Sequence, residues 1–264
     1  MALDLTMPGM LTYGVVLAYL AAAVALLCGW RRAGHGSYAF GFALAATAVV
    51  WRWHQVGRVP LQNLFEVFLC LGMLSYPLWL FCRRFLKIEG GATDPLLGLI
   101  VMFPAAFVFD AAPSNAPPAL QSWMFLPHVG AYVLAYVVLF KATVPALAGL
   151  LGRTGSVDEG RPDYELTVFR LIRLAFPLLT SGLILGSMWG MMAWGSYWNW
   201  DPKELWGLTM WLLYLGYFQF RRASGARYPR ANCAVALAGA AVIVITLMWV
   251  NLARIFAGLH AYVV

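Results

Sequence analysis

Runs of about 20 apolar residues recur along the whole chain, and this recurrence restricts the possible folds more than any other feature. A hydrocarbon core of ~30 Å requires about 20 apolar residues per helix, whereas the strands of a membrane barrel alternate apolar and polar residues. The runs do not alternate, so the sequence predicts an all-α integral membrane protein with about eight transmembrane helices. These are expected at Leu11–Gly29, Tyr38–Trp53, Leu64–Phe81, Pro95–Phe109, His128–Leu147, Leu174–Ala193, Glu204–Phe220 and Ala231–Leu252.

The composition indicates a single polytopic membrane domain over residues 1–264. Hydrophobic residues make up 62% of the chain and charged residues 11%, which leaves too little polar surface for a water-soluble globule. The longest polar connection, Gly152–Tyr164, is too short to form a core of its own. Two connections are longer or more unusual than a link between helices requires, and we interpret them as outward loops: residues 110–127 and 189–203.

The positions of the basic residues predict the orientation of the helices. The net charge of +7 would suggest a nucleic-acid partner for a soluble protein, but 13 of the 18 Lys and Arg residues lie at alternate ends of the expected helices. Cytoplasmic loops of membrane proteins carry such an excess, so we expect both termini to face outward and no nucleic-acid partner. No Lys or Arg precedes Arg31, and the first apolar run is therefore expected to persist rather than to be cleaved as a signal peptide.

The cysteines argue against thiol chemistry. They lie in or at the ends of apolar runs and form no CxxC or CxxCH motif, so neither a thiol oxidoreductase nor a covalently attached c-type haem is expected. We interpret them as small buried residues. They are Cys28, Cys70, Cys82 and Cys233.

Tryptophans are concentrated in the stretch WGSYWNWDPKELW, residues 194–206. An aromatic belt at the membrane interface, the simpler explanation, would spread them over many helix ends. Five of the twelve instead fall within residues 189–206, and large flat rings beside a glycine that permits close approach indicate a surface for a flat π-system. The predicted surface consists of Trp189, Trp194, Gly195, Trp198, Trp200 and Trp206.

The acidic residues at the end of this stretch predict the start of a helix. Asp201 suits the N-cap, Pro202 the first helical position and Glu204 the third position of a capping box. Whether Asp201 and Glu204 only cap the helix or also contribute to a binding site stays open. The positive end of the helix dipole would suit an anionic group such as a propionate.

Two of the four histidines are candidate metal ligands. His128 and His260 are both expected on the outward side of the membrane, which also carries the predicted outward loop 189–203, called the tryptophan loop below. Neutral imidazoles are ordinary axial ligands of haem iron, and two from different helices could hold the iron from both sides of the porphyrin. His54 is interpreted as a polar tip at the membrane interface, and His35 as a solvated residue of a cytoplasmic turn, GHGS.

A few basic residues depart from the inward bias and are expected on the outward side of the membrane. We expect their side chains to reach the lipid headgroups of the outer leaflet, although pairing with haem propionates is an alternative. Glu66 is an ionisable residue near the outward end of its apolar run and hence a functional candidate. The basic residues in question are Arg52, Arg58, Lys203 and Arg254.

The tryptophan stretch resembles the signature of the haem-handling cytochrome c biogenesis proteins, in particular those of the CcsA/ResC type. Three further stretches resemble this family: RVPLQNLFE (Arg58–Glu66), FLPHVGAY (Phe125–Tyr132) and GLHAY (Gly258–Tyr262). The resemblance extends from about Val50 to the end of the chain. It differs at Gln219 and Arg58, where many family members carry histidine.

The resemblance implies non-covalent haem b, with His128 and His260 as ligands of the iron, presented at the outward face for covalent attachment to the CxxCH motif of apocytochrome c. It implies a CcsB/ResB-type membrane partner and a possible role as a component of a holocytochrome c synthase, a haem lyase. It also implies a bacterial inner membrane or a thylakoid membrane. Gln219 stands in place of histidine near the inward end of the helix expected at Glu204–Phe220, and this argues against a second haem site there.

Three alternatives remain open at the sequence level. A CcmC-type protein, which delivers haem to a chaperone, would be expected to have six spans. A b-type electron-transfer subunit would usually carry two histidine pairs within its helices. A transporter or structural subunit with a tryptophan-rich vestibule would bind no haem.

Overall fold

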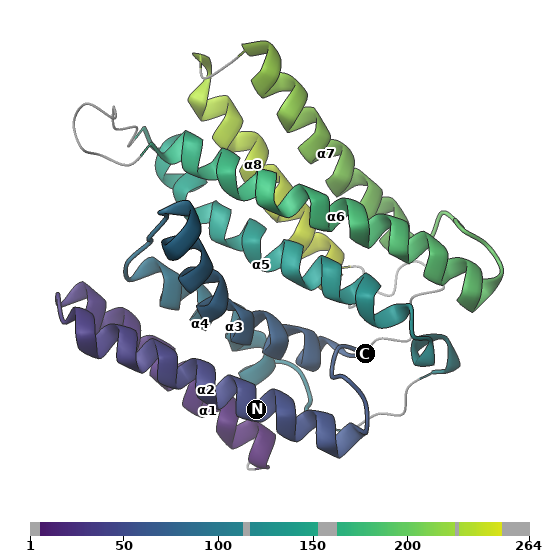
Figure 1. Ribbon diagram of the computed structural model, residues 1–264, viewed down its shortest axis with the longest axis horizontal. Helices are drawn as coiled ribbons and strands as arrows, with labels where there is room; N and C mark the ends of the chain where they lie inside the picture. Colours follow the sequence, from purple (N-terminus) through teal and green to yellow (C-terminus); the bar gives the residue numbers. More distant parts are fainter. Residues whose placement is uncertain (1–5, 113–116, 153–162, 225–226, 250–264) are drawn as a thin grey trace. The chain divides into compact units, whose positions relative to one another are not determined.

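Eight α-helices form the part of the chain that the computed structural model describes, residues 6–112, 117–152, 163–224 and 227–249 (Figure 1). These ranges contain no strand, so the prediction of an all-α fold is confirmed. Each helix overlaps one expected apolar segment. The helices are α1 (Met7–Leu27), α2 (Arg31–Val56), α3 (Leu64–Phe81), α4 (Thr93–Phe107), α5 (Phe125–Leu150), α6 (Tyr164–Trp194), α7 (Pro202–Ser224) and α8 (Pro229–Val244).

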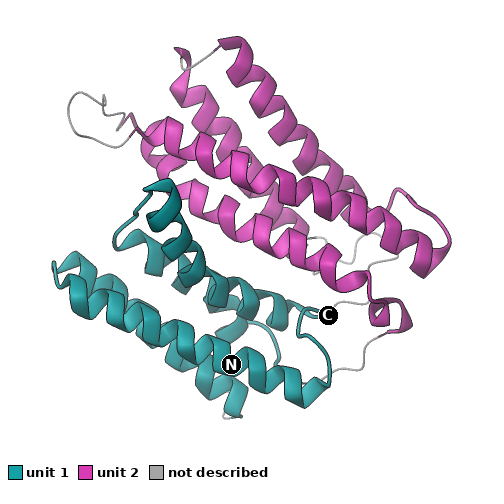
Figure 2. Cartoon of the chain, viewed as in Figure 1, with its two compact units in different colours: residues 1–116 teal, residues 117–264 magenta. Residues whose placement is uncertain are grey.

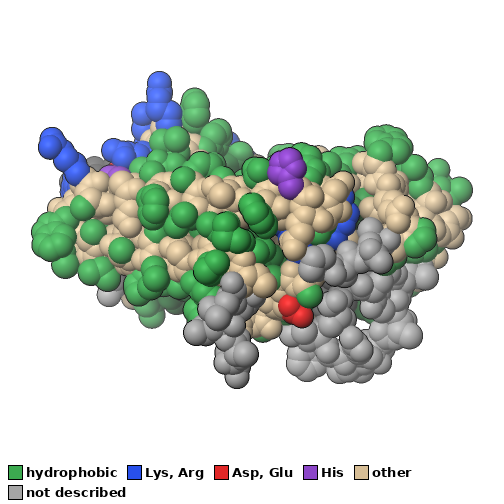
Figure 3. All heavy atoms as spheres, turned by 90° about the horizontal axis from the view of Figure 1, so that it is seen from below, with side chains coloured by type: hydrophobic (Ala, Val, Ile, Leu, Met, Phe, Trp, Pro, Cys, Tyr) green, Lys and Arg blue, Asp and Glu red, His purple; other side chains and the backbone are tan. Residues whose placement is uncertain are grey.

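Five of the described helices are long and apolar enough to cross a membrane, and the chain is an integral membrane protein. They are α1, α3 with the π-helical turn η1 (Cys82–Leu86), α5, α6, and α8 with its continuation to Met248 in η5 (Ile245–Trp249). Helix α4 is apolar but shorter. Helices α2 and α7 carry several charged residues at their ends. Hydrophobic side chains are spread over the face seen in Figure 3, as expected of a surface in contact with lipid.

Helices α2 and α6 begin earlier than the apolar runs predict. Helix α6 starts at Tyr164 because Asp163 caps it, its Oδ1 accepting a hydrogen bond of 2.9 Å from the backbone N–H of Leu166. Helix α2 starts at Arg31, two residues after Gly29, whose φ of +79° lies in the turn between α1 and α2. An apolar run marks the part of a helix within lipid, whereas the cap of α6 and the turn before α2 decide where these helices begin.

The interpretation of His35 as part of a solvated turn is therefore wrong. His35 lies inside α2, and its ring stacks on Trp79 of α3 with centroids 4.9 Å apart. Its Nε2 lies 3.9 Å from Oε1 of Glu89. The two glycines of GHGS suggested a turn, but they are helical here.

The chain divides into two compact units, residues 1–116 and 117–264 (Figure 2). In unit 1, α1 packs along α2 and α4, and α3 packs against α4. Tyr19 of α1 is fully buried in this packing and donates a hydrogen bond of 3.0 Å to the carbonyl of Gly72 in α3. A buried hydroxyl that finds a backbone acceptor fixes the register of the two helices.

In unit 2, α5 packs most extensively against α6, and α8 packs against α5 and α7. A buried carboxylate ties three helix ends together. Glu165 of α6 accepts hydrogen bonds of 2.7 and 3.1 Å from Arg221 of α7 and one of 2.9 Å from Asn232 of α8. The guanidinium of Arg221 also lies 3.8 Å from the ring centroid of Phe169. These contacts fix the end of unit 2 opposite to the tryptophan loop.

Candidate functional site

The tryptophan loop leaves α6 through a glycine. Gly195 has a φ of +74° and ends α6, its N–H donating to the carbonyl of Met191 at 3.0 Å. An added Cβ at Gly195 would meet no atom within 4 Å, so the backbone is open on this side. Trp200, just before α7, also has a positive φ of 58°. Such a conformation is uncommon for a bulky residue.

The predicted capping box at the start of α7 is confirmed. The Oδ1 of Asp201 accepts a hydrogen bond of 2.9 Å from the N–H of Lys203. The Oε2 of Glu204 accepts bonds from the backbone N–H groups of Asp201, at 3.2 Å, and of Asn199, at 2.8 Å. The two carboxylates thus satisfy backbone donors of the helix start and the loop, and place negative charge at the positive end of the dipole. This geometry favours a structural role for both acids over binding of a propionate there.

Lys203 supplies the positive charge of this loop. It precedes the predicted span, and desolvation by its surroundings lowers the pKa of its amine to about 8. The carboxylate of Asp201 acts in the opposite direction and favours the charged form. Lys203 is the cation closest in sequence to the exposed rings of the loop.

Asp201→Ala is expected to lower the free energy of unfolding by about 0.5–2 kcal/mol, because it removes the N-cap acceptor of α7. Thr209→Ala is the matched control, since Thr209 is exposed on the same helix and bonds only to the carbonyl of Leu205 among the described contacts. Denaturant titration of both variants in detergent micelles measures the difference. Equal stability of the two variants would show that the cap contributes nothing.

Trp189 is a core residue. Its side chain is 1% exposed, and its Nε1–H donates a hydrogen bond of 3.0 Å to the carbonyl of Ala119. Ala119 belongs to η2 (Pro118–Gln121), within the other predicted outward loop. The ring of Trp194 meets Trp189 edge-on with centroids 4.7 Å apart. Trp189 therefore connects η2 to the end of α6.

The remaining tryptophans of the motif are more accessible. Trp198 and Trp200 form an edge-to-face pair with centroids 6.0 Å apart, and Trp200 is 69% exposed. Trp194, Trp198 and Trp206 are half-buried. The sequence predicted one continuous aromatic surface. The structure divides it into a buried base, Trp189, and an accessible rim, which consists of Trp194, Trp198, Trp200 and Trp206.

His128 lies at the start of α5 against this buried base. Its ring is parallel to that of Trp189, with an interplanar angle of 12° and centroids 5.7 Å apart. Its Nδ1 lies 2.9 Å from the carbonyl oxygen of Gly182 in α6. Because a carbonyl only accepts hydrogen bonds, Nδ1 carries the proton, and in the neutral ring the lone pair is on Nε2. A hydrogen bond of this kind orients metal-binding histidines in many proteins.

The second predicted ligand, His260, lies outside the described residues, as does Arg254. Among the described residues, no group of three or more His, Cys, Asp and Glu side chains could hold a metal ion on its own. A haem iron needs only one or two protein ligands, so this finding does not bear on the proposed axial ligation.

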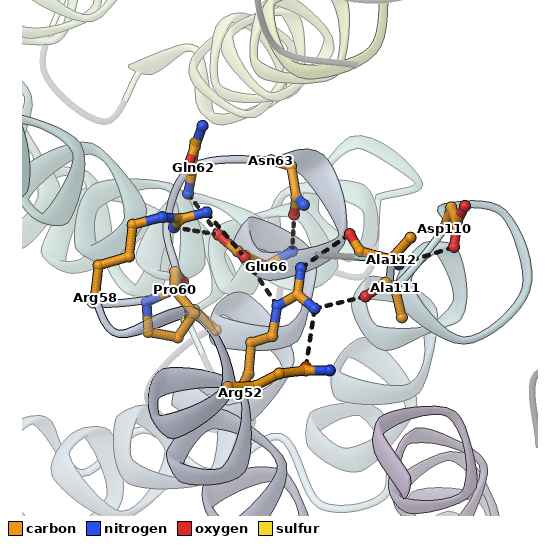
Figure 4. A network of polar contacts seen from close by, with 11 residues as sticks. Arg52, Arg58, Pro60, Gln62, Asn63, Glu66, Asp110, Ala111 and Ala112 are labelled. Carbon is orange, nitrogen blue, oxygen red and sulfur yellow. Dashed lines mark hydrogen bonds and ion pairs between the residues drawn. The ribbon is translucent and has the colours of Figure 1, made fainter. Parts of the chain in front are cut away.

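Arg52 and Glu66 form a buried ion pair in unit 1 (Figure 4). Both side chains are fully buried, and Nε of Arg52 lies 2.9 Å from Oε1 of Glu66. The expectation that Arg52 reaches the lipid headgroups is wrong, because Glu66 and nearby carbonyls satisfy its guanidinium inside the protein. These further acceptors are Oε1 of Gln55 and the carbonyls of Ala111 and Ala112.

Glu66 receives donors from several directions. Arg58, which is half-buried, donates to Oε2 at 3.0 Å, and the N–H of Gln62 donates to the same oxygen at 2.9 Å. Asn63 caps α3 and accepts from the N–H of Glu66. Glu66 was a functional candidate from the sequence, and the structure shows it as the centre of a network that holds the end of α2, the start of α3 and the segment after α4 (Figure 4). Nothing in the sequence indicated that the carbonyls of Ala111 and Ala112 would accept hydrogen bonds from Arg52.

The fold and the site define an all-helical integral membrane protein with an aromatic loop between two of its helices. The model of the family "Cytochrome C assembly protein" matches residues 38–257. The chain therefore belongs to the cytochrome c assembly protein family, and its role is in cytochrome c biogenesis.

Cytochrome c biogenesis proteins named CcsA are similar to this protein over most of its length. The cytochrome c biogenesis protein CcsA of Synechococcus sp. (strain CC9902) is 32% identical over 83% of this chain and 83% of its own length. The CcsA protein of Synechococcus sp. (strain RCC307) is 29% identical over 96% of this chain and 94% of its own.

A solved structure shares the fold. The cytochrome c haem lyase CcmF matches with a TM-score of 0.67 and 18% sequence identity over 94% of this chain. The match covers 48% of that chain, so this protein corresponds to about half of it.

Proposed function

We propose that this protein binds haem b non-covalently beside its tryptophan loop, at the outward membrane face, and presents it for covalent attachment to apocytochrome c. The observation that carries the proposal is the fixed imidazole of His128. Its hydrogen bond to Gly182 selects the tautomer in which Nε2 can donate a lone pair to iron. Membership of the cytochrome c assembly family supports haem handling.

The residues of the loop fit a flat, largely apolar group with an exposed edge. The base formed by Trp189 and His128 is rigid, since each ring is held by a hydrogen bond to a backbone carbonyl. Trp200 offers an accessible ring, and Gly195 lets a ligand approach the backbone. When bound, haem would supply the two vinyl groups to which the cysteine thiols of a CxxCH motif add. The protein's own contribution is to position the reactants and exclude water.

The finer assignments belong to the same proposal. His260 is the proposed second axial ligand, from the resemblance of GLHAY to the family motif. Eight spans with both termini outward would place His128, His260 and the loop on one face. A CcsB/ResB-type membrane protein is the proposed partner in a holocytochrome c synthase, in a bacterial inner membrane or a thylakoid. The eight described helices fit this type better than a CcmC-type protein with six spans.

The absorption spectrum of the protein purified from haem-replete cells tests this proposal. We expect a low-spin b-type signal in the reduced-minus-oxidised spectrum, because two imidazoles form a strong axial field. His128→Ala and His260→Ala are each expected to lose the signal or convert it to a high-spin form. His54→Ala is the control, since His54 is exposed on α2. A wild-type protein without haem would refute the proposal.

A further inference from the structure

Glycines line α6 where it faces the aromatic side chains of α5. Gly182 and Gly186 are one helical turn apart. A Cβ added at Gly182 would lie 2.9 Å from Cδ2 of Tyr132. One added at Gly186 would lie 2.5 Å from Cε1 and 2.7 Å from Nδ1 of His128. Non-bonded carbon atoms attract one another best at about 3.5–4.0 Å, so side chains at these positions would displace the rings of α5.

The imidazole of His128 has little room to yield. One ring contact is its parallel stack on Trp189, and Tyr132 meets it edge-on with centroids 5.3 Å apart. Its Nδ1 is held by the carbonyl of Gly182. A methyl group at Gly186 would press on the ring itself rather than on the end of a flexible chain. The ring could move only by losing its stack on Trp189 or its bond to Gly182.

We infer that Gly182 and Gly186 are positioning residues that set the direction of the Nε2 lone pair of His128. Gly182 acts through its carbonyl oxygen, which fixes the tautomer and one point of the ring. Gly186 acts through the absence of a side chain, which lets the ring lie close to the backbone of α6 while it stacks on Trp189 of the same helix. The inference deepens the proposed function and rests on His128 being an axial ligand of haem iron.

Gly186→Ala tests the inference, with Gly130→Ala as the matched control. Gly130 lies on α5, two residues from His128, and a Cβ there would meet no atom within 4 Å. Both changes add one methyl group to a helical glycine. We expect Gly186→Ala to retain at least tenfold less haem on dilution and to shift the remaining haem toward the high-spin spectrum. Gly130→Ala should match the wild type in both measurements.

The possible results distinguish a failure of this inference from a failure of the proposed haem-binding function. A wild type without haem overturns both. A wild type with low-spin haem whose spectrum and retention are unchanged by Gly186→Ala overturns the inference alone. A loss of haem in both glycine variants would also overturn it, because the effect would then follow from any added methyl group.

A double-mutant cycle covers the case in which Gly186→Ala folds but is too unstable for its haem content to be interpreted. The inference states that the added methyl group presses on the imidazole, so His128→Ala should restore part of the stability that Gly186→Ala loses. The unfolding midpoints of apoprotein from haem-depleted cells are compared for the wild type, both single variants and the double variant. The Gly186 substitution should lower the midpoint less when His128 is absent. An equal decrease in both backgrounds would show that Gly186 acts through other contacts and would overturn the inference.

Discussion

Glu66→Gln is expected to reduce the free energy of unfolding by about 3–5 kcal/mol, since it keeps the shape of the side chain but leaves the charge of Arg52 buried and uncompensated. Arg52 cannot reach solvent, because its guanidinium is enclosed by the ends of α2 and α3 and by the carbonyls of Ala111 and Ala112. Unfolding by SDS in mixed micelles, followed by circular dichroism, measures the change.

Glu89→Gln is the matched control for Glu66→Gln. Glu89 lies 3.7 Å from Nε of Arg83, but both side chains are about half exposed. An exposed ion pair contributes about 0–1 kcal/mol. A similar loss in the two variants would mean that burial of the Arg52 pair has no energetic consequence and would contradict the expected result.

Removing both partners of the buried pair separates charge from packing. Arg52→Met combined with Glu66→Leu replaces two buried charges by apolar groups of similar size, and such replacements in other proteins are often neutral or stabilising. We expect the double variant to be more stable than Glu66→Gln. It should still be less stable than the wild type, since Arg58 and the carbonyls of Ala111 and Ala112 lose their partners.

The helices and the start of α7 were predictable because both depend on local sequence. A run of apolar residues defines a helix in lipid, and the order Asp201, Pro202, Glu204 specifies a cap whatever surrounds it. His35 was misplaced for a related reason. The glycines around it suggested a turn, although the packing of its ring on Trp79 favours a helix, and that contact comes from a distant part of the sequence.

The environment of the candidate site could not be predicted because it depends on contacts between distant residues. Arg52 was expected at the headgroups, since no sequence rule pairs it with Glu66 or with the carbonyl of Ala111. The acceptor for Nδ1 of His128 is likewise a backbone carbonyl, 54 residues away in the chain. Backbone acceptors leave no trace in the residue type that supplies them, so a sequence identifies the chemical group but not what orients it.

The sequence also did not show which tryptophans of the cluster are buried, and the burial of Trp189 predicts a large effect of its removal. Trp189→Ala should reduce the free energy of unfolding by about 3–5 kcal/mol, because it removes a fully buried indole and leaves a cavity. The loss also frees the carbonyl of Ala119 and the stacked face of His128. Unfolding of the apoprotein in detergent measures this effect without any contribution from a ligand.

Trp200→Ala should give the opposite pattern. Its ring is 69% exposed, so the stability of the apoprotein should change by no more than about 0.5 kcal/mol. If the accessible rim binds haem, Trp200→Ala should nevertheless retain less haem than the wild type on dilution. Equal haem retention would remove Trp200 from the proposed platform, whereas a large loss of apoprotein stability would show that its ring packs inside the protein. Under the proposed function, two tryptophans of this cluster would act in different ways: Trp189 holds the buried base through its hydrogen bond to Ala119, and Trp200 would contact the bound haem.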